Sequence, residues 1–174
     1  SGLVLLLAQI ALGGWTSTNY AALACTEFPA CHGGQWWPDA DFREGFTLWR
    51  GLGVNYEYGV LDSAARAAIH LTHRIGALLV LIYLGALALI LIRHGDTGVY
   101  RNIAYIILVI LLLQVGLGIA NVLSHLALPV AVAHNGGAAL LLLSLVTLLH
   151  LATTPMAATQ PSSKLAPEAL GEQT

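Results

Sequence analysis

The sequence predicts an all-α polytopic membrane protein, a four-transmembrane-helix bundle with an internal pseudo-twofold repeat of helix pairs. Of its 174 residues, 57% are hydrophobic and only 9% are charged, which is a composition of the membrane class. A helix that spans a hydrocarbon core of ~30 Å needs about 20 apolar residues. Four segments meet this requirement, namely 2–23, 66–92, 102–124 and 131–151. The third observation is that these segments repeat in pairs.

Helix-boundary signals define the segments in order. Asp62 or Ser63 is a suitable N-cap for the second segment, which ends at the basic turn Arg93-His94 and at Gly95. Pro129 lies in a very short link between the third and fourth segments, so these two helices are expected to be antiparallel neighbours.

The distribution of cations predicts the orientation. Arg93 and Arg101 flank the link between the second and third segments, whereas the link near Pro129 has no Lys or Arg. The positive-inside rule therefore places the Arg-bearing link in the cytoplasm and the loop 24–65 outside, and we expect a bacterial inner membrane. The tail 155–174 is expected to be cytoplasmic and disordered, which leaves 1–154 as one four-helix transmembrane domain. The net charge of −2 excludes a basic surface for nucleic acid, and membrane lipid is an expected partner.

The predicted outer loop holds both cysteines, Cys25 and Cys31. On the oxidising side of a membrane a disulfide is the simpler interpretation, with free or redox-active thiols as the alternative. Trp36 and Trp37 are typical of an interfacial belt, and 42–49 is a candidate for a short helix on the membrane. Alternatively, these aromatic residues only anchor the loop.

The repeat relates the first segment to the third and the second to the fourth. The run from Gln9 to Gly13 matches the run from Gln114 to Gly118, and the run that begins at His73 matches the one that begins at His134. A parallel duplication of a helix pair predicts a pseudo-twofold axis along the membrane normal. Such an axis makes His73 and His134 symmetry mates that face each other across the bundle.

The two histidines are also predicted to lie at one depth. His73 is ~28 Å from the cytoplasmic end of its helix and His134 is ~27 Å from the end of its own, at 1.5 Å per residue. Two opposed imidazoles in a four-helix bundle are suited to axial ligation of haem iron. The alternative is that each histidine only forms a hydrogen bond across helices or caps one at the interface.

Several neighbouring residues are candidates for a haem site. Gly76 and Gly137 follow the histidines by three positions and leave room for a macrocycle on the same helix face. Gln9 or Gln114 is a candidate hydrogen-bond partner for the remaining ring nitrogen. Arg74 is a candidate partner for a haem propionate.

Arg66 is a second candidate for a propionate, while Arg74 has the alternative of extending outward to the interface. His70 is one helical turn from His73 and is a weak catalytic candidate, either as a relay or as a hydrogen-bond donor. An interfacial histidine with no function is the other interpretation.

Together these motifs resemble the C-terminal half of the haem A synthase family (COX15/CtaA). The similarity covers about 9–150 and rests on four stretches, which are 9–20, 25–31 followed by Gln-Trp-Trp-Pro, 69–74 and 133–138. The resemblance implies an eight-helix protein of two similar halves, an oxidoreductase that converts a methyl group of haem O to the formyl group of haem A. It implies that His73 and His134 bind the iron of a resident haem b and that Cys25 and Cys31 form a disulfide.

The sequence also departs from the family pattern. The family's substrate half has a Glu three residues before its ligand histidine, and His70 stands at that position here. We therefore expect this chain to hold haem b while the substrate site belongs to the N-terminal half of the same protein, with haem O synthase as a further candidate partner. The chain begins at Ser1 without an initiator Met, and we expect it to be part of a longer protein. A bis-His cytochrome b subunit that only transfers electrons is the alternative.

Overall fold

The computed structural model describes residues 1–49, 51, 59–95 and 98–154. These residues form helices and loops, with one isolated bridge between His32 and Gln35 and no strand among them. The helices are α1 (Gly2–Thr18), α2 (Phe42–Gly45), α3 (Ser63–His94), α4 (Gly98–Leu123) and α5 (Leu128–Thr153). The predicted disordered tail, 155–174, lies outside the described residues.

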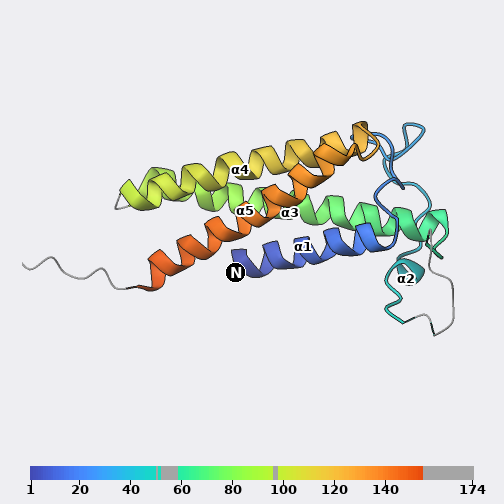
Figure 1. Ribbon diagram of the computed structural model, residues 1–174, viewed down its shortest axis with the longest axis horizontal. Helices are drawn as coiled ribbons and strands as arrows, with labels where there is room; N and C mark the ends of the chain where they lie inside the picture. The colour runs from blue at the N-terminus through green and yellow to red at the C-terminus, as the bar shows by residue number, and fades with distance from the viewer. Residues whose placement is uncertain (50, 52–58, 96–97, 155–174) are drawn as a thin grey trace, which may run out of the picture.

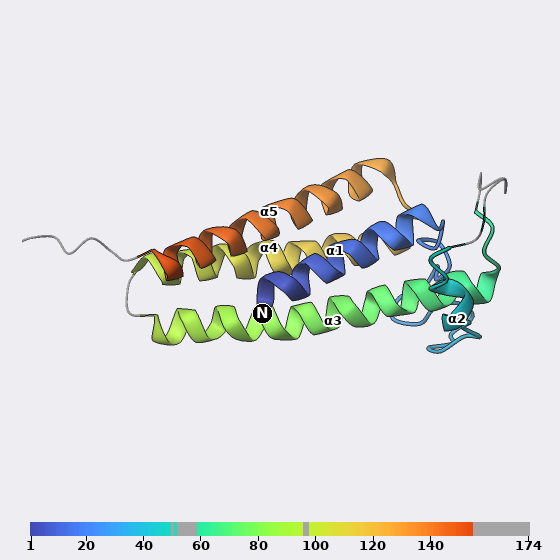
Figure 2. The ribbon, with the colours of Figure 1, turned by 90° about the horizontal axis from the view of Figure 1, so that it is seen from below.

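Four of these helices lie along one long axis (Figure 1). Helix α3 packs against α1 and α4, while α5 packs against α4 and α1, so that the four helices form a closed ring. The view from below separates α5, α4, α1 and α3 clearly (Figure 2). Because α3 and α5 do not pack against each other in the described part of the chain, they occupy opposite corners of the bundle.

Three helices, α3, α4 and α5, are long and apolar enough to cross a membrane. The all-helical membrane fold predicted from composition is thus confirmed at this level. Helix α1 is apolar as well but has only 17 residues, so it does not meet the same length requirement.

The helix ends differ from the predicted ones for local reasons. Helix α3 begins at Ser63 because the Asp62 side chain accepts a hydrogen bond from the Ala65 backbone N–H. Helix α5 begins before Pro129, which lies in its first turn, where the missing N–H has no consequence. Helix α4 likewise begins earlier than predicted, at Gly98.

Helices α1 and α4 end in the same way. Tyr20 (φ 53°) and His125 (φ 51°) adopt left-handed backbone conformations directly after the two helices. Ala21 N–H then donates to the Thr16 carbonyl, and Leu126 N–H donates to the carbonyl five residues before it. This turn ends α1 at Thr18, five residues earlier than predicted.

The apolar core lies toward one end of the bundle. All four long helices contribute buried residues to it, namely Leu6, Val80, Leu84, Ala88, Ala104, Ile107, Leu111, Leu141 and Leu145. We call the opposite end, where α1 ends and α3 begins, the loop end. On each of the four helices the residues of this cluster stop before the loop end, and His73 and His134 lie closer to the loop end than the cluster does. Two smaller buried clusters, which include Ile69 and Leu71, lie at the loop end itself.

Helix α2 packs against the start of α3 at the loop end (Figure 1). Asp41 caps it by accepting a hydrogen bond from Glu44 N–H, and Trp15 Nε1 donates to the Gly45 carbonyl at 3.0 Å. The backbones approach so closely that a Cβ on Gly45 would lie 2.8 Å from the Ala65 carbonyl oxygen. The helix predicted for 42–49 therefore exists, but it is one turn long.

Candidate functional site

His73 is held by a glutamine of the neighbouring helix. The Gln9 side-chain Nε2 donates to the His73 backbone carbonyl at 3.0 Å and lies 3.1 Å from the ring Nδ1 of the same residue. One amide thus contacts both the backbone and the ring of His73, which ties α1 to α3 and limits rotation of the imidazole.

His134 has a corresponding partner in the second pair of helices. The Gln114 Nε2 atom, on α4, lies 3.4 Å from Nε2 of the His134 ring, on α5. This contact is longer than the one made by Gln9, and it involves the ring alone.

Two glycines missed by the sequence reasoning allow these contacts. A Cβ on Gly13 would lie 3.3 Å from His73 Cε1, and a Cβ on Gly118 would lie 3.2 Å from His134 Cε1. Each imidazole therefore lies against the backbone of the neighbouring helix. The signal was present, because a Gln followed four residues later by a Gly occurs in both matched runs and places the two on one helix face.

Gly76 and Gly137 have a role that differs from the expected one. A Cβ on Gly76 would overlap Gln9 Oε1, and a Cβ on Gly137 would overlap Gln114 Oε1. In this structure the space beside each glycine is occupied by a glutamine amide. Room for a macrocycle at these two positions stays a prediction.

The site is a buried polar layer with incomplete hydrogen bonding. Among the described residues, the buried side-chain atoms that lack a partner are Gln9 Oε1, Gln114 Oε1, Asn121 Oδ1 and His134 Nδ1. Buried polar groups are nearly always paired, so such a cluster indicates a missing partner. A buried ring nitrogen without a hydrogen-bond partner, as in the half-buried His134, is a suitable ligand for a metal.

His70 does not take part in this layer. Its ring Nδ1 lies 3.0 Å from the Ala21 carbonyl oxygen, and only 5% of the residue is exposed. The Ala21 carbonyl follows the left-handed turn that ends α1. His70 thus links the end of α1 to α3, and a catalytic role for it stays a prediction.

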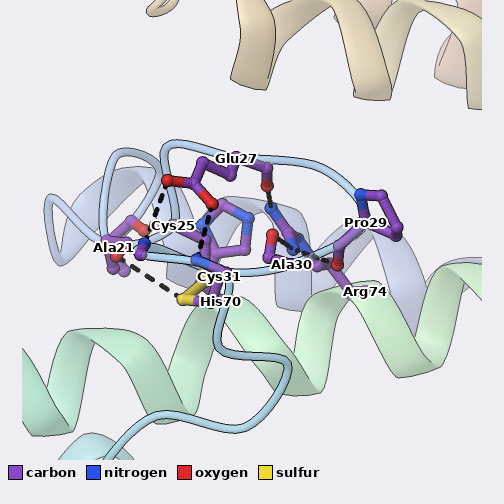
Figure 3. The surroundings of a disulfide bond; sticks show 11 residues. Ala21, Cys25, Glu27, Pro29, Ala30, Cys31, His70 and Arg74 are labelled. Atoms are coloured by element: carbon purple, nitrogen blue, oxygen red, sulfur yellow. Dashed lines mark hydrogen bonds between the residues drawn. A yellow bond between two sulfur atoms is a disulfide. The ribbon is translucent and has the colours of Figure 1, made fainter.

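Arg74 points into the disulfide loop (Figure 3). Its Nη2 donates to the Glu27 carbonyl at 2.7 Å, and its Nη1 donates to the Ala30 carbonyl at 2.9 Å and to the Pro29 carbonyl at 3.3 Å. The guanidinium also lies 5.7 Å from the centroid of the Phe28 ring. Arg74 had two alternatives, a haem propionate or an outward extension to the interface, and these contacts resemble the outward extension.

The other predicted propionate partner, Arg66, lies at the start of α3. Its Nε donates to the Asp62 carbonyl at 3.4 Å on the same helix. Pairing of either arginine with a propionate stays a prediction.

The cysteines lie at disulfide distance, as expected. The Cys25 and Cys31 sulfur atoms are 2.05 Å apart, and both residues are fully buried (Figure 3). The Glu27 carboxylate accepts hydrogen bonds from Gly33 N–H and Gly34 N–H, which closes the following turn. The loop is therefore held from within by the disulfide and Glu27, and from α3 by Arg74.

Comparison with known proteins adds an independent observation. Residues 1–146 match the family COX15-CtaA, described as cytochrome oxidase assembly protein. The chain is 47% identical over 146 residues to a protein of Shewanella oneidensis named heme A synthase, which covers 84% of this chain and 43% of that protein. The chain thus spans less than half the length of this curated relative. No solved structure matches.

Proposed function

Because the chain belongs to the COX15-CtaA family of cytochrome oxidase assembly proteins, we propose that it forms the haem-b-binding, C-terminal half of a haem A synthase. The complete enzyme would oxidise the methyl group of haem O to the formyl group of haem A. In this proposal His73 and His134 would hold the iron of the resident haem b.

The unpaired nitrogen of His134 is the observation that carries the proposal. His134 Nδ1 is buried without a partner, in a layer where two glutamine oxygens are also unpaired. His73 and His134 stand on helices at opposite corners of the bundle, the arrangement that two ligands on opposite faces of a planar group require. The donor set therefore fits a bis-His haem, which when bound would supply one-electron transfer.

The repeat of helix pairs supports a pseudo-twofold arrangement. In each pair of helices a glutamine amide contacts the histidine ring, one glycine lies against that ring, and a second glycine lies against the amide. We propose that α1 is the fourth transmembrane helix and that the axis relates α1 to α4 and α3 to α5. The shared left-handed turns at Tyr20 and His125 support the same relation.

The proposed orientation follows from the cations at the two ends. Arg93 ends α3 and Arg101 lies in the first turn of α4, at the end of the bundle opposite the disulfide loop. The positive-inside rule places that end in the cytoplasm and the loop end outside, in the bacterial inner membrane. A disulfide on the outer side agrees with the oxidising compartment.

The substrate site is assigned to the rest of the protein. At the position of the substrate half's Glu, this chain has His70, whose ring Nδ1 is engaged by the Ala21 carbonyl. We therefore propose that this half holds haem b and transfers electrons, and that the N-terminal half oxidises haem O supplied by haem O synthase.

The test is the haem spectrum of the purified chain. We expect low-spin, six-coordinate haem b in a reduced-minus-oxidised spectrum, and loss of that spectrum in His73→Ala and in His134→Ala. His94→Ala and His150→Ala, at the far ends of α3 and α5, are matched controls that should retain it. Retention of the spectrum in both ligand variants would refute the assignment.

The enzymatic part needs the longer protein. When co-expressed with haem O synthase, a protein that carries both halves should yield haem A, whereas this chain alone should retain only haem b. Haem b without any haem A in the longer protein would favour an electron-transfer cytochrome b instead.

A further inference from the structure

We propose that Gln9 and Gln114 are positioning residues that orient His73 and His134 as haem ligands and tune the reduction potential of the iron. This inference rests on the proposed function, because it concerns the same two histidines. It adds two residues whose role is to act through the ligands.

Gln9 is well placed to fix the ring plane of His73. Its amide nitrogen is 3.0 Å from the His73 carbonyl oxygen and 3.1 Å from the ring Nδ1. The backbone contact anchors the amide to the residue that it orients, so ring and amide move together. The ring Nε2, on the opposite edge from this contact, would be the atom that binds iron once the ring proton is on Nδ1.

The amide itself is confined by a glycine. Gln9 Oε1 occupies the space that a Cβ on Gly76 would fill, and Gln114 Oε1 occupies the corresponding space at Gly137. A glutamine loses side-chain conformational freedom when it is ordered. In both helix pairs a glycine leaves the space that the glutamine amide occupies. The repeated arrangement indicates that the position of the amide is important for the histidine beside it.

The chemistry of the amide explains why a glutamine serves here. A histidine that binds a metal through one nitrogen carries a proton on the other, and the acceptor of that proton sets the orientation and basicity of the ligand. The amide would offer Oε1 as that acceptor after a half-turn about its last bond, which would exchange the Nε2 contact with the His73 carbonyl for a bond from the ring N–H. Oε1 of both glutamines is without another partner among the described residues. A neutral acceptor keeps the imidazole neutral, whereas a carboxylate would draw the proton away.

The two glutamines are not equivalent. Gln9 contacts ring and backbone of His73, whereas Gln114 contacts only the His134 ring, at 3.4 Å. We therefore expect a change at Gln9 to have the larger effect.

The experiment compares glutamine variants in the full chain, purified with haem. Gln9→Met and Gln114→Met keep the length of the side chain but remove the acceptor, and Gln9→Glu replaces it with a carboxylate. Gln35→Met, on an exposed loop residue, is the matched control. The measurements are the rate of haem transfer to apomyoglobin, the midpoint potential and the low-spin electron paramagnetic resonance spectrum.

The expected results separate positioning from folding. Gln9→Met should weaken haem binding by about 10- to 100-fold, and Gln114→Met by less. Gln9→Glu should retain haem but shift the midpoint potential to more negative values, because a more anionic ligand stabilises ferric iron. Gly76→Ala should reproduce the Gln9→Met effect by displacing the amide.

Two outcomes would contradict the proposals, one for the glutamines and one for the haem site itself. A purely structural role would lower the yield of folded protein while the retained haem keeps the wild-type potential and spectrum, and this result would overturn the inference. Failure of the unsubstituted chain to bind haem would instead overturn the proposed function, and the inference with it.

Discussion

Replacement of Arg74 by Met should expose the disulfide loop to reductant. Arg74 donates two short hydrogen bonds, at 2.7 and 2.9 Å, and a weaker one at 3.3 Å, all to loop carbonyls. A hydrogen bond to a charged group contributes about 1.5–3 kcal/mol when it is well buried. Because the Arg74 guanidinium is half-buried, we reduce the two short bonds to about 1–2 kcal/mol together. This free energy corresponds to a factor of about 5–30 in the population of the open loop.

The assay measures the rate at which dithiothreitol and an alkylating reagent modify Cys25 and Cys31. With fast opening and closing, this rate follows the open population, so Arg74→Met should react about 5–30 times faster than the unsubstituted chain. Arg74→Lys should be intermediate, because an ammonium cannot match the fork of donors. Arg66→Met, which removes a cation whose side chain donates to the Asp62 carbonyl at the start of the same helix, is the control. Equal rates for all four proteins would refute the reasoning.

Three further predictions concern stability, measured by thermal unfolding in detergent. Ile69→Ala, in a fully buried position, should cost about 2–5 kcal/mol, whereas Leu78→Ala on the exposed face should cost much less, and equal losses would contradict the assigned burial. Gly45→Ala should cost about 1–3 kcal/mol by overpacking against α3, and the region around α2 should then be cleaved faster by protease; no change would exclude the close approach. The double variant Cys25→Ser/Cys31→Ser should lose about 2 kcal/mol of stability, because the disulfide no longer closes a loop over a separation of six residues. Reductant should then have no effect on the stability of this variant.

The membrane fold could be predicted because the hydropathy and the length of an apolar segment are read directly from its residues. The matched runs also related Gln9 to Gln114 and His73 to His134. In each pair the glutamine amide nitrogen lies near a ring nitrogen of the histidine, which is Nδ1 in His73 and Nε2 in His134. Periodicity is strong in long apolar segments, so these relations were within reach of the sequence.

Other features depended on backbone positions that side-chain patterns do not encode. Arg74 binds three carbonyls, and any residue type supplies a carbonyl, so nothing in the sequence marked the disulfide loop as its partner. The same holds for His70 and the Ala21 carbonyl. The end of α1 was set by the left-handed turn at Tyr20, a conformation that is uncommon for a tyrosine and was therefore not expected.

The apolar core separates the polar layer from the far end of the bundle. From Leu6, Val80, Leu111 and Leu141 onward, away from the loop end, the buried core residues in the described part of the chain are aliphatic, with Ser144 as the buried polar residue among them. A proton or an ion that enters this stretch loses its hydration without gaining a charged partner. We therefore expect His73 and His134 to exchange protons through the loop end of the bundle and not through the apolar core.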